Sequence, residues 1–404
     1  MKVIVQKYGG SSVADPEKLK KIAEMVAAVK SEGYGIAVVV SAMGKTTNSL
    51  IELSNSVSKD PVRREMDMLL SAGERITMSL LCMALNDLGV EAISLTGSQA
   101  GIITNDRHND ARVIEVRPIR VQDEMDKGKV VVVGGFQGVS YKRDVTTLGR
   151  GGSDTSAVAL AAALNAARCE IYSDVDGVYT ADPTLVKEAK HLPEISYQQM
   201  QEMSTAGAKV MNSQAIQFAK ESGIIIYARS TFKPGSETII KTTKSGQTKG
   251  ITSVVHENDV VRVILSYKNQ AKDFNDLIKT LEEKQVTIKE LNVAEAQSDE
   301  INSKASFVVS YKNVYGWENL KERLQERFKE NIEFDFNLGA LSIIGEGLNR
   351  DNETLLTSMS ILENINVKVY GISTTSYRLS FLVAGKDLLK GVKAIHKRWI
   401  EENV

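Results

Sequence analysis

The fold is decided by residues 2–40, which read KVIVQKYGGSSVADPEKLKKIAEMVAAVKSEGYGIAVVV. Residues 2–7 predict a strand, and Asp15 is placed to cap the helix that follows the glycine turn. Within residues 19–29 apolar side chains recur every three or four positions, which indicates one buried helix face. The all-apolar run 36–40 predicts a second strand that is buried on both faces. Strand, helix and buried strand in this order indicate a βαβ unit.

The same pattern continues and predicts one large α/β domain over residues 1–245. Short apolar runs lie at 92–95, 130–133, 170–172 and 224–227, and long helical patterns lie at 65–88, 154–167 and 206–222. Strands that are apolar throughout are usually covered on both faces. We therefore expect a mostly parallel sheet between layers of helices.

The order of elements changes after residues 233–258, which hold no sustained apolar period and are expected to be a connector. Residues 260–336 predict the order β-α-β-β-α-β, and a similar order recurs about 80 residues later. We expect two ferredoxin-like modules, at 246–337 and 338–404, whose strands could interleave. Small modules of this kind usually bind ligands or partners.

Composition excludes several classes of protein. The 404 residues carry 50 Lys and Arg against 51 Asp and Glu, a formal net charge of -1, so a nucleic-acid partner held by a general basic field is not expected. No run approaches the ~18 apolar residues of a membrane span, and no basic segment followed by an apolar stretch begins the chain. We expect a cytoplasmic protein with no membrane partner. Cys82 and Cys169 are expected to be buried free thiols.

The first candidate for chemistry is the turn at residues 7–12, KYGGSS, at the carboxyl end of the first strand. Ligands of open α/β sheets bind at this edge. Two glycines let backbone N–H groups approach phosphate oxygens, the helix start adds partial positive charge, and Lys7 adds a full one. A structural turn explains this motif equally well when it is taken alone.

Two further loops follow strands. Residues 41–47, SAMGKTT, end like a P-loop, but the first glycine of a P-loop is replaced by Val39, so a P-loop NTPase is excluded. Residues 146–154, TTLGRGGSD, lead into an alanine-rich helix. Arg150 could grip a carboxylate with two parallel hydrogen bonds. Helix capping explains Asp154 as well as a catalytic role does.

Acidic residues gather in 173–183, SDVDGVYTADP, after the next strand. They could face a nucleotide, although tight turns are the better explanation of this segment alone. Glu74 follows Gly73 inside a long helical pattern, where a glycine costs ~1 kcal/mol relative to alanine. We therefore expect another part of the chain or a ligand to approach the helix backbone there. The four histidines show no metal spacing and receive no role.

Six blocks in this order resemble the aspartate kinases, which combine the amino acid kinase fold with paired C-terminal ACT modules. The blocks are residues 7–12, 39–47, 71–74, 146–154, 176–183 and 207–210. The resemblance is most specific over residues 1–240. It implies that ATP phosphorylates the β-carboxylate of L-aspartate to 4-phospho-L-aspartate, which opens the pathway to lysine, threonine and methionine.

The resemblance also implies roles for individual residues. Lys7 would contact the transferred phosphoryl group and Asp154 would orient Lys7. Arg150 would hold the α-carboxylate of the substrate and Glu74 its α-ammonium. The remaining substrate contacts would come from Ser41, Thr47, Gly151, Gly152 and Ser153. The nucleotide would be surrounded by Lys7, Tyr8, Gly9, Gly10, Ser173, Asp174, Tyr179, Asp182, Lys209 and Val210.

The implied reaction suits these residue types. A carboxylate with a reference pKa of ~3.9 is already ionised at neutral pH, so no general base is required. The difficulty is to bring an anion to the γ-phosphate, which calls for positive charge, aligned N–H groups and Mg²⁺. The resemblance implies that ATP phosphates hold the Mg²⁺, with no metal site on the protein, and that ACT modules pair in a homodimer or higher homo-oligomer.

Two departures from the family pattern bear on these expectations. Thr184 stands where the family usually has an arginine, which Lys187 or Lys190 could replace. Residues 267–271 lack the Asp-x-Pro-Gly turn of the effector pocket, and the second module keeps 345–348 but lacks a later glycine. Feedback by lysine or threonine could therefore be altered or lost.

Two alternatives to an aspartate kinase remain open at this point. One is another acyl-phosphate-forming or nucleotide kinase of the same fold, such as a glutamate or acetylglutamate kinase. The other is a catalytically silent amino-acid sensor that uses the C-terminal modules as a ligand-dependent dimer interface. Glu74 with Arg150 favours a free α-amino acid over an acetylated one. Retention of Lys7, Arg150 and Asp154 disfavours the silent sensor.

Overall fold

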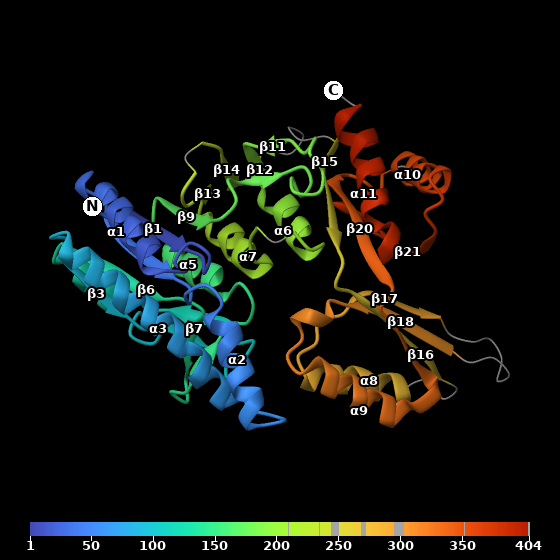
Figure 1. Cartoon of the computed structure of the whole chain (residues 1–404), viewed down its shortest axis with the longest axis horizontal. Coiled ribbons are helices and arrows are strands. Elements are labelled where there is room, and N and C mark those ends of the chain that lie inside the picture. Colours follow the sequence, from blue (N-terminus) through green and yellow to red (C-terminus); the bar gives the residue numbers. More distant parts are fainter. Residues whose placement is uncertain are drawn as a thin grey trace. The chain divides into compact units, whose positions relative to one another are not determined.

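A computed structural model describes residues 1–208, 210–233, 235–243, 250–267, 272–294, 303–350 and 352–402 (Figure 1). The chain forms two units. The first comprises Met1–Tyr179, Lys190–Thr205 and Lys209–Gln247, and the second comprises Thr180–Ala189, Ala206–Ala208 and Thr248–Val404. The segment 180–189 leaves the first unit and contributes Ala181 and Val186 to the apolar core of the second.

The first unit is built on a sheet whose eight strands, among the described residues, lie in the order β12-β14-β13-β9-β1-β2-β6-β3. The strands are β1 (Val3–Tyr8), β2 (Gly35–Val40), β3 (Ala92–Leu95), β6 (Val130–Gly134), β9 (Arg168–Ser173), β12 (Glu194–Ser196), β13 (Ile226–Ser230) and β14 (Glu237–Lys241). Only the pairing of β13 with β14 is antiparallel among these described strands. The expected mostly parallel sheet is confirmed.

Smaller elements complete this unit. A second sheet has the order β5-β4-β7-β8, with β4 (Ile102–Thr104), β5 (Val113–Val116), β7 (Gln137–Ser140) and β8 (Val145–Thr147), and β10 (Val178–Tyr179) pairs with β11 (His191–Leu192). The helices are α1 (Pro16–Ser31), α2 (Thr46–Val57), α3 (Arg63–Asp87), α4 (Ile119–Asp126), α5 (Gly152–Ala163), α6 (Tyr197–Thr205) and α7 (Ser213–Ser222).

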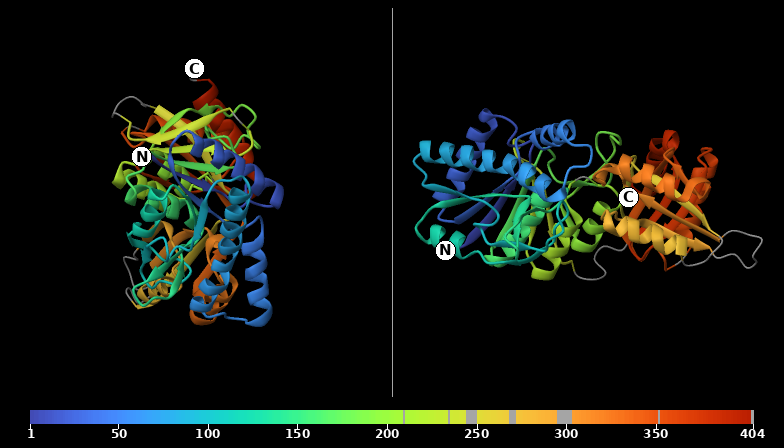
Figure 2. Two further views of the ribbon diagram at one scale, coloured as in Figure 1. Left: turned by 90° about the vertical axis from the view of Figure 1, so that its left-hand side faces the viewer. Right: turned by 90° about the horizontal axis from the view of Figure 1, so that it is seen from below.

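Helices cover both faces of the large sheet (Figure 2). Helix α1 begins as the sequence predicts, because the Asp15 side chain accepts a hydrogen bond of 2.9 Å from the Lys18 N–H. Its apolar face and that of α3 pack in one core with Tyr8 of β1. Successive strand residues point to opposite faces, so Lys7 points to the other side, where it meets α5.

The second unit holds two four-stranded sheets within its described residues, each covered by two helices. The order β17-β18-β16-β19 joins β16 (Val261–Tyr267), β17 (Lys289–Ala294), β18 (Ser303–Val309) and β19 (Ile332–Asp335), with α8 (Lys272–Glu283) and α9 (Trp317–Phe328). The order β15-β20-β22-β21 joins β15 (Gly250–Glu257), β20 (Leu338–Glu346), β21 (Val369–Thr374) and β22 (Arg378–Ala384), with α10 (Glu353–Asn364) and α11 (Leu388–His396).

Two expectations about this architecture need correction. The expected connector 233–258 contains two strands, β14 and β15. Their Thr, Ser and Lys residues are typical of a loop, and their pairing with β13 and β20 shows that they are strands. Strand β15 pairs with β20, so the sheet of the second module takes a strand from the range 246–337, in agreement with the expectation that the strands of the two modules could interleave. The helix expected over 206–222 begins at Ser213, because Gly207 has φ +110° and Asn212 caps the helix.

Other features agree with the sequence. Cys82 and Cys169 are buried free thiols, as expected. Helix α3 is long and apolar enough to cross a membrane by length and composition, yet half of its most apolar window is buried inside the unit. Asp67 and Glu74 lie on its buried side.

Gly73 lies in the interior of α3 because the loop after β2 approaches the helix there. A Cβ atom at position 73 would lie 2.7 Å from the Cβ of Ala42, closer than real Cβ contacts come. The expected close approach to the helix backbone is confirmed, and the approaching group is a loop of the same unit.

We expect Gly73→Ala to destabilise the protein, although alanine favours helices. The gain in helix propensity of about 1 kcal/mol is opposed by overpacking against a rigid methyl group, which costs about 1–3 kcal/mol. Gly391→Ala in α11 is the control, since the nearest atoms, 3.2 and 3.3 Å away, are movable ends of Leu341 and Leu362. Urea unfolding followed by circular dichroism measures both. A Gly73→Ala protein as stable as the wild type would contradict the close approach.

Candidate active site

Backbone hydrogen bonds join the loops that follow β1, β2 and β9. The Gly44 N–H donates to the Gly10 carbonyl at 3.0 Å, and the Gly9 N–H donates to the Tyr172 carbonyl at 3.1 Å. A Cβ atom on Gly10 would lie 3.0 Å from the Ala42 carbonyl oxygen, so only glycine leaves this spacing undisturbed. The structure thus brings the predicted loops 7–12 and 41–47 together at the carboxyl edge of the sheet.

Lys7 and Asp154 form a nearly buried ion pair at this edge. Lys7 Nζ lies 2.7 Å from Asp154 Oδ1, and the two side chains are 11% and 8% exposed. Asp154 lies in the first turn of α5, where the helix dipole stabilises a negative charge. Gly9 lies beside the pair, since a Cβ atom at position 9 would be 3.4 Å from Lys7 Nζ, an ordinary contact distance.

Glu74 is a buried carboxylate with one oxygen left over. Its Oε1 accepts a hydrogen bond of 3.0 Å from the Ala42 N–H, while Oε2 has no partner among the described residues. Burial raises the pKa of this carboxyl to about 7, and the hydrogen bond from Ala42 opposes the rise. A cationic hydrogen-bond donor placed at Oε2 would satisfy the oxygen and favour its ionised form.

The turn that carries Arg150 has an unusual backbone. Gly149 and Gly151 have φ +70° and +69°, in the left-handed region. A Cβ on Gly151 would lie 2.6 Å from the Cβ of Asn212, whose Nδ2 donates to the Arg150 carbonyl at 2.6 Å. The Asn212 N–H donates to Asp154 Oδ2 at 3.4 Å. The Arg150 side chain itself is exposed.

Sequence reasoning missed two residues beside this turn. Asn212 was hidden because the helix was expected to begin at residue 206, although Asn before a helical pattern is a cap signal. Phe136 has φ +65°, and a Cβ on Gly152 would lie 3.1 Å from its Cδ2. A bulky residue in that region is strained, and strain of this kind is common where ligands bind. The glycines flanking it at 135 and 138 were the available signal.

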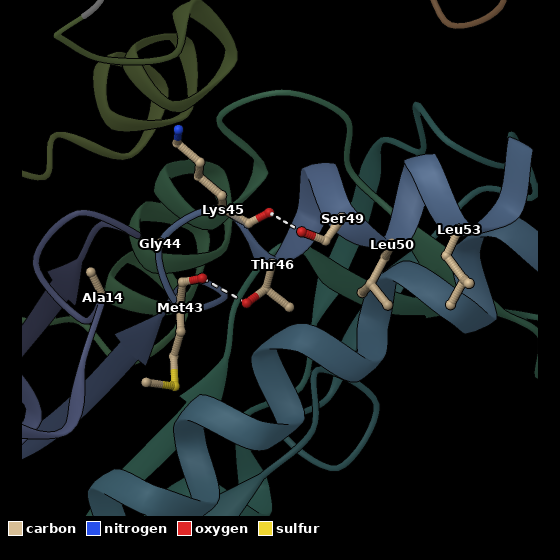
Figure 3. Close-up of a pocket in the computed structure, with 8 residues that line it drawn as sticks. All are labelled: Ala14, Met43, Gly44, Lys45, Thr46, Ser49, Leu50 and Leu53. Carbon is tan, nitrogen blue, oxygen red and sulfur yellow. Dashed lines mark hydrogen bonds between the residues drawn. The ribbon is translucent and has the colours of Figure 1, made fainter. Parts of the chain in front are cut away.

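The remaining predicted substrate residues lie on the same loops. Ser41 follows β2 and Thr47 lies in the first turn of α2, and both are half-buried. Ser153 is buried in the first turn of α5. A cavity of about 470 Å³ opens at the start of α2, and its lining residues are Ala14, Met43, Gly44, Lys45, Thr46, Ser49, Leu50 and Leu53 (Figure 3). Met43 and Lys45 extend from the loop in opposite directions.

The acidic segment after β9 forms the tight turns that were the favoured explanation. Tyr179 Oη donates to Asp176 Oδ1 at 2.9 Å, and Ser173 Oγ donates to the Val175 carbonyl at 3.3 Å. Asp182 lies in the second unit, where its Oδ1 accepts hydrogen bonds of 2.9 and 2.6 Å from the N–H and hydroxyl of Thr184. These contacts leave the predicted nucleotide roles untested.

The structure describes two of the three other predicted positions. Asp174 is exposed and Val210 is half-buried. Lys209 lies outside the described residues, as do positions 268–271 of the turn in which the first ACT-like module departs from the family pattern.

Within the part of the chain that the structure describes, no three His, Cys, Asp or Glu side chains come together in a way that could hold a metal ion. Mg²⁺ is expected to be held through the phosphate oxygens of ATP.

Known proteins resemble this chain in sequence and in fold. The model of the amino acid kinase family matches residues 2–229. An aspartokinase of Corynebacterium efficiens is 38% identical over 405 residues, covering 99% of this chain and 96% of that relative. Two solved structures of E. coli aspartokinase III share the fold. The complex with aspartate and ADP has a TM-score of 0.83 at 23% identity and covers 98% of this chain and 99% of its own. The complex with lysine and aspartate has a TM-score of 0.73 at 22% identity, with the same coverage.

These matches agree with the loops gathered around Lys7 and with the α/β unit followed by two four-stranded sheets. The chain belongs to the amino acid kinase family and, within it, to the aspartokinases.

Proposed function

We propose that the chain transfers the γ-phosphoryl group of ATP to the β-carboxylate of L-aspartate, giving 4-phospho-L-aspartate and ADP. The observation that supports this best is the pairing of two features at one edge of the sheet. One is a nearly buried lysine held by Asp154, and the other is Glu74 with an unpartnered buried oxygen. The first suits a phosphoryl group in transfer and the second suits a substrate ammonium group.

This phosphoryl transfer depends more on electrostatic stabilisation than on the transfer of a proton. The attacking carboxylate is ionised at neutral pH, so the barrier lies in bringing it to an anionic phosphate. Lys7 supplies a cation whose position is fixed by the ion pair of 2.7 Å with Asp154. The N–H groups of the glycine turn and the start of α5 add oriented positive dipoles. Mg²⁺ bound to ATP supplies further charge neutralisation.

Recognition of a free α-amino acid is assigned to two groups. Glu74 Oε2 would accept from the α-ammonium, and Arg150 would hold the α-carboxylate through its fork of N–H donors. Ser41, Thr47 and Ser153 would add hydroxyl contacts, and the backbone of Gly151 and Gly152 would let the substrate approach closely. An N-acetylated substrate has no ammonium group and would leave Glu74 Oε2 unsatisfied, which disfavours acetylglutamate.

The nucleotide is assigned to the loops after β1 and β9. Tyr8, Gly9 and Gly10 would lie along the phosphates, with Ser173, Asp174, Tyr179, Asp182, Lys209 and Val210 around the rest. Thr184, which donates to Asp182, stands where the family usually has an arginine. Lys187 and Lys190 remain the proposed substitutes.

Assembly, regulation and location are also proposals. ACT-type modules favour a homodimer or higher homo-oligomer and an amino-acid effector. We also propose that it works in the cytoplasm, where aspartate and ATP are available.

A hydroxylamine trap of the acyl phosphate tests the proposed function. With Mg-ATP, we expect hydroxamate from L-aspartate and little from L-glutamate or N-acetyl-L-glutamate. Hydroxamate from glutamate alone would favour the glutamate kinase, and none from any substrate would favour the silent amino-acid sensor.

Replacement of Lys7 tests the phosphoryl-transfer assignment. Lys7→Ala should lower kcat by a factor of about 10²–10³, the usual cost of losing one group that stabilises transition-state charge. Lys20→Ala is the control, since Lys20 is an exposed lysine that pairs with Glu17 across one helical turn. Initial rates of ADP formation measure both. A near-normal kcat for Lys7→Ala in folded protein would remove Lys7 from the transfer step.

The raised pKa of Glu74, about 7, predicts a pH-dependent affinity for aspartate. Below this pH the carboxyl is protonated and loses the charge that attracts an ammonium group. The KM for aspartate should therefore fall as the pH rises from 6 to 8, by up to about tenfold per pH unit on the acid side. The KM for ATP should stay nearly constant.

Glu74→Gln supplies the matched variant for this pH test. Glutamine keeps the shape but cannot ionise, so the KM for aspartate should be high and independent of pH over the same range. An unchanged pH profile in Glu74→Gln would show that another group controls aspartate binding.

A further inference from the structure

We propose that Asp67 is a positioning residue that ties α3 to the turn of Arg150 and so fixes the separation between Glu74 and Arg150. This inference rests on the proposed function, because it assigns to those two residues the α-ammonium and α-carboxylate of one substrate. The distance between those substrate groups is fixed by covalent geometry. A site that grips both must therefore hold its own two groups at a constant spacing.

Asp67 is completely buried and receives hydrogen bonds from separate segments. Its Oδ1 accepts from the Thr147 hydroxyl at 2.5 Å and from the Asn109 N–H at 3.0 Å. Its Oδ2 lies 2.6 Å from His108 Nδ1, which donates when the carboxylate is ionised. Burial raises the pKa of Asp67, and these hydrogen bonds oppose the rise. Burial of a carboxylate costs free energy unless its oxygens accept hydrogen bonds, and these three contacts provide them.

The network leads directly to the turn of Arg150. Thr147 ends β8 three residues before Arg150, and its carbonyl accepts from the Ala111 N–H at 2.8 Å. The loop containing residues 108–111 also closes on Gly149, where a Cβ would lie 2.9 Å from Asp110 Oδ1. The start of the turn is therefore held on two sides, by α3 through Asp67 and by this loop.

Helix α3 carries Glu74 on the same side as Asp67. The two residues are seven positions apart, about two helical turns, so their side chains project in nearly the same direction. Both are buried in a helix of 25 residues, which is rigid over this length. One carboxylate of α3 thus faces the proposed ammonium site, and the other fixes the strand that leads to the proposed carboxylate site.

Thr147→Val tests this inference without removing the buried carboxylate. Valine has nearly the shape of threonine but cannot donate to Asp67. We expect the KM for aspartate to rise about tenfold, with kcat and the KM for ATP unchanged, because one buried hydrogen bond that orients the turn is lost. Thr147→Ser restores a hydroxyl donor and should return the KM for aspartate close to the wild-type value.

Thr104→Val is the matched control. Thr104 is also fully buried in the same small sheet, and its hydroxyl bonds the Thr146 hydroxyl at 2.6 Å and the Asn105 carbonyl at 2.8 Å, without reaching α3. Thr104→Val should lower the midpoint of thermal unfolding while leaving the KM for aspartate unchanged. A general packing role of this sheet would instead give both variants the same kinetic effect.

The outcomes separate this inference from the proposed function. If the wild-type protein forms no hydroxamate with aspartate, the proposed function fails before any variant is measured. If the wild type is active and Thr147→Val has a wild-type KM for aspartate, the positioning role of Asp67 is overturned. An equal rise in Thr104→Val would overturn it as well.

Discussion

The ion pair between Lys7 and Asp154 is the interaction on which the site depends. A lysine ammonium and a carboxylate that are both about nine-tenths buried persist only as partners, because either charge alone would pay several kcal/mol of desolvation. The pair joins the end of β1 to the first turn of α5. Sheet and helix must therefore meet at one spacing, and the glycines at 9 and 10 allow the neighbouring loops to close around that meeting point.

The buried carboxylates of the first unit fall into two kinds. Glu170 is bound by Gln6, Arg168, Arg229 and Tyr172 at 2.7–3.1 Å. Asp154 and Asp67 are likewise held by partners within the protein. Glu74 differs, because its Oε2 has neither a hydrogen bond nor an ion pair among the described residues, whereas Asp154 Oδ1 is paired with Lys7. A buried carboxylate oxygen in this state is suited to a ligand with a cationic donor.

Periodicity in the sequence was sufficient for the central sheet and its main helices. The helix of residues 19–29 and the strand of residues 36–40 were found because a helix or strand buried in a sheet carries its own apolar pattern. Strand β15 was missed because its burial comes from pairing with β20, almost a hundred residues away, and its Thr and Ser residues resemble a loop. The start of α7 was misplaced because Gly207 and Asn212 act through backbone geometry that an apolar pattern does not report.

The candidate site shows the same limit in a sharper form. Lys7, Glu74, Arg150 and Asp154 were found because they stand beside glycines or at helix starts, which are local signals. Asp67 carried no such signal, since an acidic residue near the beginning of a helix pattern is ordinary. Its meaning comes from Thr147, which is 80 positions away in the sequence and 2.5 Å away in the structure. A residue that binds a ligand can be marked by the turn that presents it. A residue that sets the distance between two such turns is visible only once the chain has folded.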